Sequence, residues 1–216
     1  MPPTLAIFDL DYTILNGDSE MLWARFLNKQ GIVSDEFVRQ MERYYDDYER
    51  GKLDMISYEE FLLQPLTSYQ LEELNTLRVE YLEWVAGLIR PQMMDRVAWH
   101  RKQGHLLLLI TASNSFIVEP IARALGFEHV ICSQVEFDGD KLTGRLDGMP
   151  AYRGGKVKLL GQWLEKNQMT LADSWGYSDS HNDLPLLSLV DHPVVVSPSD
   201  ALYALAKRNQ WEIILI

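Results

Sequence analysis

The sequence predicts an α/β protein in which a parallel sheet is interrupted by a block of helices. Two observations support this fold class. Short apolar runs alternate with helical patterns from residue 91 to the C-terminus, as expected for parallel strands joined by crossover helices. Between the first apolar run, at residues 5–10, and residue 91, apolar residues recur only at helical spacing. We therefore expect a core made of residues 1–16 and 89–216, with a helical segment, residues 17–88, inserted after the first strand.

The inserted segment begins after a short turn. Asp18 or Ser19 is expected to cap its first helix. Apolar and aromatic residues then form groups at helical spacing, and Gly31, Gly51 and Pro65 mark the breaks between these groups. The segment therefore predicts about four helices.

After the segment, the predicted elements follow in a regular order. Pro91 opens a helix that ends before Gly104. The apolar run at residues 105–111 is too short for a typical helix and suits a strand buried on both faces of a sheet. The later elements are a helix at 114–125, a strand at 129–135, a hairpin-like segment at 138–148, a helix at 156–167, strands at 174–177 and 193–197, a helix at 200–209 and a strand at 211–216. This order predicts one parallel sheet with right-handed crossovers.

The composition limits the classes of partner. The 216 residues carry 20 Lys and Arg against 31 Asp and Glu, a formal net charge of −11. This charge opposes nonspecific binding to nucleic acids and to anionic membranes. The single cysteine, Cys132, excludes an internal disulfide, and no apolar run reaches the length of a membrane span. We expect a cytoplasmic monomer or homodimer without a targeting segment, which binds neither nucleic acid nor a membrane.

Polar residues stand where three of the predicted strands end. Asp9 and Asp11 follow the first strand, and residues two apart in a strand point to the same face. Two adjacent buried carboxylates are unfavourable without a cation. Residues 111–113 and 178–179 end two further strands, and ligands bind at the carboxyl edge of such a sheet. We therefore expect these three groups to form one site.

The chain contains four motifs with chemical groups at the expected ends of strands and helices: Asp9-Leu10-Asp11-Tyr12-Thr13, Thr111-Ala112-Ser113, Gly155-Lys156 and Ser178-Asp179-Ser180-His181-Asn182-Asp183. These motifs resemble those of the haloacid dehalogenase superfamily, whose phosphatases use an aspartate nucleophile. They stand in the order of the superfamily, and the resemblance covers the whole chain. It implies a Rossmann-like core with a helical cap of the C1 type after the first strand, as in the branch that includes phosphoserine phosphatase.

The resemblance also implies roles for the acidic residues. Asp9 is expected to attack phosphorus and form an aspartyl phosphate, with Asp11 as general acid and base. The implied cofactor is Mg²⁺, a hard cation that prefers oxygen ligands. Its expected ligands are Asp9, Asp179 and the backbone oxygen of Asp11, with Asp183 in the outer shell.

Other residues are expected to bind the phosphate or the leaving group. The Thr111 hydroxyl would donate to the phosphate, and Lys156 would supply a fixed positive charge. Lys158 is the alternative lysine. The remaining candidates for substrate contact are Ala112, Ser113, Asn182, Asp18 and His181. The Asp18 carboxylate can equally cap a helix, and His181 can be a surface residue.

The helical segment indicates the substrate class. Aligned with phosphoserine phosphatases, Leu62 stands where those enzymes place an arginine that holds the substrate carboxylate, with Arg50 and Lys52 nearby. A segment rich in Asp, Glu and Tyr without this arginine favours a cationic or aromatic leaving group. We therefore expect a small phosphate ester as substrate, with L-histidinol phosphate ahead of phosphoserine, because relatives in this branch include histidinol-phosphatases.

Two other functions stay open. A phosphotransferase would form the same aspartyl phosphate but pass the phosphoryl group to an alcohol. A noncatalytic sensor would bind a phosphorylated ligand, although it would not require the complete set of catalytic residues. A dehalogenase is disfavoured because those relatives lack the metal and the second aspartate of the first motif.

Overall fold

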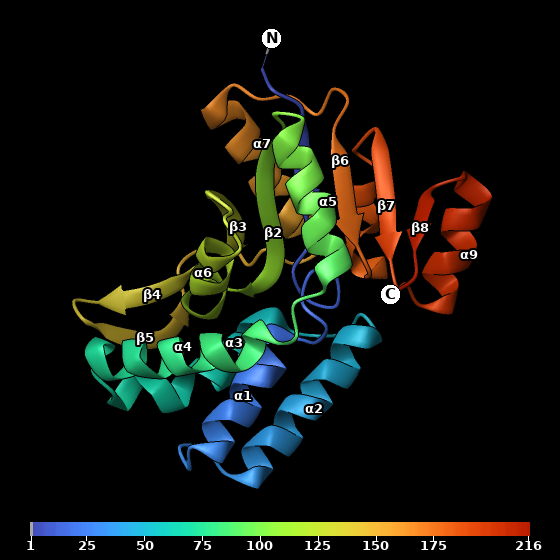
Figure 1. Ribbon diagram of the computed structural model, residues 1–216. Helices are drawn as coiled ribbons and strands as arrows, with labels where there is room; N and C mark the ends of the chain where they lie inside the picture. Colours follow the sequence, from blue (N-terminus) through green and yellow to red (C-terminus); the bar gives the residue numbers. More distant parts are fainter. Residues whose placement is uncertain (1) are drawn as a thin grey trace.

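The computed structural model describes residues 2–216, apart from the side chain of Glu49. Its centre is a six-stranded sheet in the order β3-β2-β1-β6-β7-β8, in which every pairing is parallel (Figure 1). The strands are β1 (Leu5–Phe8), β2 (Leu106–Asn114), β3 (His129–Ser133), β6 (Trp175–Ser178), β7 (His192–Val196) and β8 (Glu212–Ile214). Helices flank this sheet, so the predicted α/β fold class is confirmed.

The middle of the sheet is buried on both faces. All four residues of β1 are buried, and they pair with β2 in parallel register from Leu5 to Phe8. The apolar run at residues 105–111 is predicted to be a strand, and β2 confirms this prediction, although it extends to Asn114. Each large apolar side chain buried in this way contributes about 1.5–3 kcal/mol to folding.

Two layers of helices cover the sheet. Helices α5 (Pro91–Lys102) and α6 (Ser115–Ala124) pack on one face, and α7 (Gly154–Asn167) and α8 (Leu184–Leu187) pack on the other. Alternate residues of β1 face these two layers in turn, because successive side chains of a strand point to opposite faces. Helix α9 (Asp200–Asn209) packs beside β7. In the part of the chain that the structure describes, no helix is long and apolar enough to cross a membrane.

The inserted segment, residues 17–88, is helical as predicted. Its elements are α1 (Ser19–Lys29), α2 (Asp35–Glu49), α3 (Met55–Leu63), the short 3₁₀ helix η1 (Gln64–Ser68) and α4 (Leu71–Ala86). Gly31 and Gly51, at two of the predicted breaks, have φ values of +74° and +65°, which favour glycine. The segment lies beneath the carboxyl edge of the sheet in Figure 1.

The chain enters and leaves this helical segment at one place. The Asn16 amide donates to the Leu88 carbonyl (2.8 Å), and the Arg90 amide donates to the Ile14 carbonyl (2.9 Å). The Arg90 guanidinium also donates to Asn16 Oδ1 (3.1 Å). The two connections therefore lie side by side. Their assignment as boundaries between a core and a cap stays a prediction.

An antiparallel hairpin leaves the sheet after β3. Its strands are β4 (Val135–Asp138) and β5 (Lys141–Leu146), and it packs against α3 and η1 (Figure 1). The strand predicted at residues 129–135 stops at Ser133. The reason is that the Ser115 hydroxyl accepts a hydrogen bond from the first amide of β4 (3.1 Å), which draws the chain out of the sheet.

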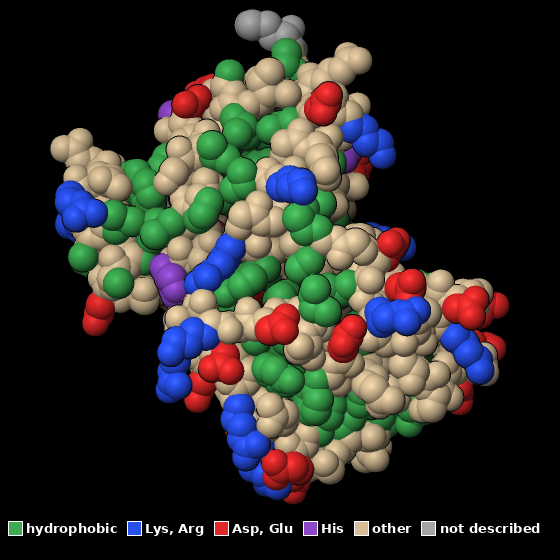
Figure 2. Space-filling model, turned by 180° about the vertical axis from the view of Figure 1, so that it is seen from behind, with side chains coloured by type: hydrophobic (Ala, Val, Ile, Leu, Met, Phe, Trp, Pro, Cys, Tyr) green, Lys and Arg blue, Asp and Glu red, His purple; other side chains and the backbone are tan. Residues whose placement is uncertain are grey.

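The charged side chains are distributed over the surface of the helical segment. Figure 2 shows basic and acidic groups interspersed around an apolar patch on its lower part. Interspersed charges of both signs produce a weaker local field than a surface of one sign would. Inside the molecule, the charged side chains of Asp9, Lys156 and Asp183 are buried at the carboxyl edge of the sheet.

Candidate active site

Asp9 lies at the carboxyl end of β1. Its amide donates to the Tyr177 carbonyl (2.9 Å), which continues the pairing of β1 with β6. The chain then turns, because the Leu10 carbonyl accepts hydrogen bonds from the amides of residues 13–15 at 2.9–3.2 Å. This turn brings Asp11 to the same pocket as Asp9.

Lys156 joins two of the acidic residues. It lies in the first turn of α7, and its side chain is only 3% exposed. Its Nζ lies 2.9 Å from Asp9 Oδ1 and 2.8 Å from Asp183 Oδ2. Asp183 also accepts a hydrogen bond from the Ser178 hydroxyl (2.8 Å). The side chain of Lys158, the alternative lysine, is exposed, so Lys156 is the lysine that contacts the acidic site.

Thr13 connects Asp9 with Asp179. Its Oγ1 lies 3.4 Å from Asp9 Oδ2 and 3.3 Å from Asp179 Oδ1, and it accepts a hydrogen bond from the Asp179 amide (3.1 Å). A hydroxyl group has a single proton to donate. Thr13 can therefore satisfy only one of the two carboxylates at a time.

These buried acids repel one another. Burial raises the pKa of Asp9 to about 7, with Lys156 opposing the rise and Asp183 and Asp11 adding to it. Burial and the charges of Asp9 and Asp183 raise the pKa of Asp179. Burial lowers the pKa of Lys156, but the two carboxylates that it contacts outweigh this effect and raise it overall. The site therefore holds more negative charge than one lysine neutralises.

The donor set fits a hard divalent cation. Within residues 2–216, no three His, Cys, Asp or Glu side chains already converge closely enough to hold a metal ion. The carboxylates of Asp9 and Asp179 nevertheless flank one hydroxyl group, and all of their donor atoms are oxygen. Mg²⁺ prefers such oxygen donors and would offset the excess negative charge.

Asp11 is held separately from this group. Its Oδ2 accepts hydrogen bonds from the Ser113 hydroxyl (2.6 Å) and the Thr111 hydroxyl (3.4 Å). Its Oδ1 accepts from the Ser19 amide (2.7 Å). Burial, and then the charge of Asp18, raise the pKa of Asp11 to about 6. A carboxyl group with this pKa can both give and take a proton near neutral pH.

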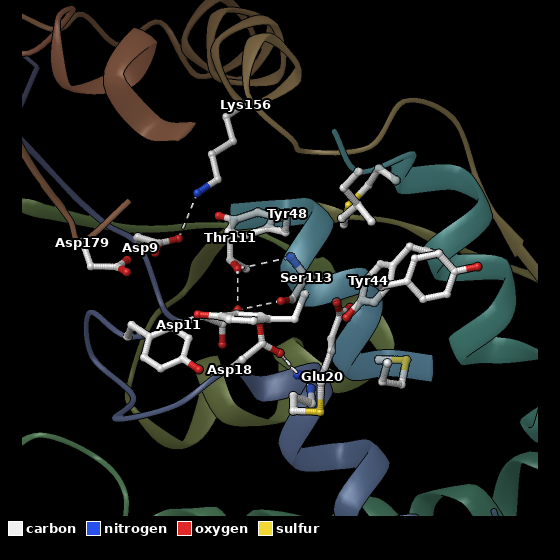
Figure 3. Close-up of a pocket in the computed structure, with 18 residues that line it drawn as sticks. Asp9, Asp11, Asp18, Glu20, Tyr44, Tyr48, Thr111, Ser113, Lys156 and Asp179 are labelled. Carbon is white, nitrogen blue, oxygen red and sulfur yellow. Dashed lines mark hydrogen bonds and ion pairs between the residues drawn. The ribbon is translucent and has the colours of Figure 1, made fainter. Parts of the chain in front are cut away.

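Asp9, Asp11, Lys156 and Asp179 line one pocket between the sheet edge and the helical segment (Figure 3). The lining residues are Asp9, Asp11, Tyr12, Asp18, Glu20, Met21, Met41, Tyr44, Tyr45, Tyr48, Leu53, Met55, Tyr58, Thr111, Ala112, Ser113, Lys156 and Asp179. Among them, Lys156 is the only Lys or Arg. In Figure 3, Asp18 and Glu20 lie on the opposite side of the labelled residues from Lys156. We call the part lined by Asp18, Glu20, Tyr44 and Tyr58 the acidic end of the pocket.

Two of the predicted substrate contacts lie outside the pocket lining. Asn182 instead accepts a hydrogen bond from Arg153 Nε (2.8 Å) and donates to the Tyr48 carbonyl (3.4 Å). Its neighbour His181 is partly buried in the short helix that follows Ser180. Asp183 lies behind the pocket, where it contacts Lys156. The other predicted site residues, including Ala112, all line the pocket.

The helical segment supplies no cation to the pocket lining among its described side chains. Leu62, at the position of the expected arginine, is fully buried in the apolar core. Arg50 and Lys52 are exposed and do not line the pocket. Asp18 acts as a helix cap, since its Oδ1 accepts from the amides of Glu20 (3.0 Å) and Met21 (2.7 Å). The carboxyl group of Asp18 lines the acidic end at the same time.

Sequence reasoning missed Thr13 and Glu20 as site residues. The threonine of the first motif was a usable signal, because it stands four residues after Asp9 within the quoted motif. Glu20 offered no such signal, since an acidic residue in the first turn of a helix is common for the helix dipole alone.

Comparisons with known proteins agree with this geometry. A family model described as haloacid dehalogenase-like hydrolase matches residues 6–188. A histidinol-phosphatase of Neisseria meningitidis serogroup C is 39% identical, over 97% of this chain and 97% of that protein. A Bordetella pertussis protein of unknown function has a structure with a TM-score of 0.91 and 37% identity, covering 99% of both chains. A phosphoserine phosphatase structure has a TM-score of 0.68 at 15% identity, covering 100% of this chain and 94% of the other, and shows the same fold.

The chain belongs to the haloacid dehalogenase-like hydrolase family, so the resemblance inferred from the motifs is confirmed. Within that family the protein is a phosphatase, a phosphoric monoester hydrolase.

Proposed function

We propose that this phosphatase hydrolyses L-histidinol phosphate with Mg²⁺ as its cofactor. The observation that carries the proposal is the acidic end of the pocket, where two carboxyl groups and several tyrosines face the space beyond the catalytic residues. Histidinol carries an ammonium group and an imidazole, and it has no carboxylate. The similarity to the Neisseria histidinol-phosphatase supports the same substrate.

In the first step, a carboxylate oxygen of Asp9 attacks phosphorus, and the bond between phosphorus and the ester oxygen breaks. Asp11 gives its proton to the departing alkoxide, so that histidinol leaves as an alcohol. In the second step, Asp11 takes a proton from a water molecule that attacks the aspartyl phosphate. Inorganic phosphate leaves and Asp9 is regenerated.

Other groups stabilise the charge on the phosphoryl oxygens. The Thr111 hydroxyl, the Ala112 amide and the Lys156 ammonium would donate to these oxygens, since all three residues line the pocket. Preorganised donors of this kind contribute about 2.7–4 kcal/mol each to transition-state stabilisation.

Mg²⁺ would be held by Asp9, Asp179 and the backbone oxygen of Asp11, with Asp183 in the outer shell. When bound, it reduces the repulsion between the nucleophilic carboxylate and the phosphate dianion. The chain's own contribution is to hold these carboxylates in place, through Thr13 on one side and Lys156 on the other.

The acidic end favours histidinol over serine as the leaving group. Asp18 can accept a hydrogen bond from the ammonium group, and the tyrosine rings can pack against a cation or a planar imidazole. Phosphoserine would bring a carboxylate to this end, where no cationic side chain of the described residues would pair with it.

A panel of phosphate esters compared by kcat/KM tests this function. We expect L-histidinol phosphate to exceed phosphoserine by at least tenfold, with Mg²⁺ required for both. Equal or faster hydrolysis of phosphoserine would overturn the substrate assignment. Adding a primary alcohol to the same assay distinguishes hydrolysis from transfer, since a phosphotransferase would form a new phosphate ester in proportion to the alcohol.

A further inference from the structure

Three buried polar side chains meet behind the acidic end of the pocket. Glu20 from α1 is 2% exposed, and Glu59 from α3 and Asn114 at the end of β2 are fully buried. Glu20 Oε1 accepts hydrogen bonds from the backbone amide (2.8 Å) and Nδ2 (2.7 Å) of Asn114. The same Nδ2 donates to Glu59 Oε2 (2.9 Å). Asn114 therefore fixes both carboxyl groups.

This cluster has more acceptors than donors. Both protons of the Asn114 amide group are used, and the Tyr58 hydroxyl donates to Glu20. Burial raises the pKa of both carboxyl groups, and the charge of Glu59 adds to the rise for Glu20. Within the part of the chain that the structure describes, Glu59 Oε1 is buried without a hydrogen-bond partner. A buried acceptor without a donor is unfavourable, so the donors around the cluster do not satisfy both carboxyl groups.

Glu20 is the member of the cluster that reaches the pocket. It lines the pocket beside Asp18, away from Lys156 (Figure 3), whereas Glu59 and Asn114 do not line it. We propose that Glu20 is a specificity-determining residue that accepts a hydrogen bond from a cationic nitrogen of the leaving group, with Glu59 and Asn114 as the positioning residues behind it. The inference rests on the proposed function, because it places the leaving group of a phosphate ester at the acidic end.

The surroundings of Glu20 select a cation over a neutral donor. Asp18 stands beside it and adds negative charge. Lys156, the one cation of the described lining residues, is bonded to Asp9 and Asp183 at the other end. The tyrosine rings of this end attract cations through their faces. A protonated nitrogen is therefore attracted both by the carboxylates and by the tyrosine rings. A neutral hydroxyl group of the same size lacks this attraction.

The test compares the parent protein with Glu20→Gln, which keeps an acceptor oxygen for Asn114 and removes the charge. The measured quantity is the ratio of kcat/KM for L-histidinol phosphate to kcat/KM for para-nitrophenyl phosphate, whose leaving group has no cation. We expect this ratio to fall about 10- to 100-fold, mainly through a higher KM for histidinol phosphate. Glu20→Asp, which keeps the charge, should retain more of the preference than Glu20→Gln does.

Glu60→Gln is the matched control. Glu60 is exposed on the same helix as Glu59, so its removal changes the net charge equally without touching the pocket. We expect its ratio to equal that of the parent. Circular dichroism and thermal unfolding establish that each variant is folded.

Two results would overturn the inference. One is an equal loss of kcat/KM for both esters in Glu20→Gln and in Glu20→Asp, since it would mean that Glu20 only supports the fold of the pocket. The other is a ratio of kcat/KM values in Glu20→Gln that equals the ratio of the parent. The proposed function fails by a different result, namely that the parent prefers phosphoserine to histidinol phosphate. In that case the role of Glu20 is tested by the ratio of kcat/KM for phosphorylethanolamine to kcat/KM for para-nitrophenyl phosphate. If the parent prefers no cationic ester, both the proposed function and the inference about Glu20 are refuted.

Discussion

Protonation of His100 should destabilise the protein in mild acid. His100 is fully buried beside the sheet, where its Nε2 lies 2.8 Å from the Tyr177 hydroxyl and its Nδ1 lies 2.8 Å from His105 Nδ1. Burial, followed by repulsion from His105 and Arg96, lowers the pKa of His100 from 6.5 to about 4. The difference between these two values corresponds to about 3 kcal/mol of stability.

Whether acid raises or lowers the stability depends on whether the unfolded or the folded state binds the proton at the higher pH. The unfolded chain protonates His100 as the pH falls through 6.5, whereas the folded protein resists until about 4. The stabilisation is therefore fully present above pH 6.5 and is lost progressively between pH 6.5 and 4. Between pH 7 and 4.5 the loss from this one group should be about 2–3 kcal/mol.

Urea unfolding of the parent and of His100→Gln at these two pH values measures the effect. Glutamine cannot titrate in this range but can still hydrogen-bond to Tyr177. On acidification, we expect the free energy of unfolding to fall by about 2–3 kcal/mol more in the parent than in the variant, because the contributions of the other titrating groups cancel in the comparison. An equal loss in parent and His100→Gln would refute the reasoning.

Three further predictions concern the catalytic site. Asp9→Asn should fold normally and lose phosphatase activity by several orders of magnitude, which release of inorganic phosphate measures; activity near the parent level would exclude Asp9 as nucleophile. EDTA should abolish the activity of the parent and added Mg²⁺ should restore it, whereas full activity in EDTA would exclude a metal cofactor. Gly155→Ala should destabilise the protein by about 1–3 kcal/mol, because its Cβ would collide with the Pro150 carbonyl. It should also reduce kcat, because residue 155 directly precedes Lys156. The free energy of unfolding measures this destabilisation, and Gly154→Ala, whose Cβ meets nothing within 4 Å, is the control. An equal loss of unfolding free energy in Gly155→Ala and Gly154→Ala would contradict the prediction.

The sequence predicted the fold and the convergence at the sheet edge for a definite physical reason. The strands of a parallel sheet run in the same direction, so polar residues at or near their carboxyl ends, such as Asp9, Thr111 and Asp179, are brought to one edge by topology alone. The apolar runs before Asp9 and Thr111 are strong local signals for strands. The sequence pattern therefore predicted that Asp9, Thr111 and Asp179 meet in one pocket without any knowledge of side-chain contacts.

The acidic end could not be predicted in this way. Glu20, Glu59 and Asn114 are far apart in the sequence and meet only because α1, α3 and the end of β2 pack together. On a helix, Glu20 resembles any acid of a first turn, and the pattern around Glu59 does not distinguish a buried glutamate from an exposed one. The hydrogen bond between Arg153 and Asn182 could not be predicted for a related reason, since it depends on how the loop after β6 packs against the neighbouring α7.

The acidic end also connects ligand recognition with the stability of the free protein. Burial raises the pKa of Asp18 to about 7 and that of Glu59 to about 8, above the ordinary range of carboxyl groups. A carboxyl group with a raised pKa adds stability below its ordinary pKa and loses that contribution as the pH rises through the raised value. The free protein is therefore less stable at alkaline pH than it would be with neutral side chains at these positions. A cationic ligand reverses this effect, because it favours the ionised carboxylates and binds the folded state alone. Under the proposed function, such a pocket would discriminate against a neutral leaving group of the same shape, because that group would recover none of this free energy.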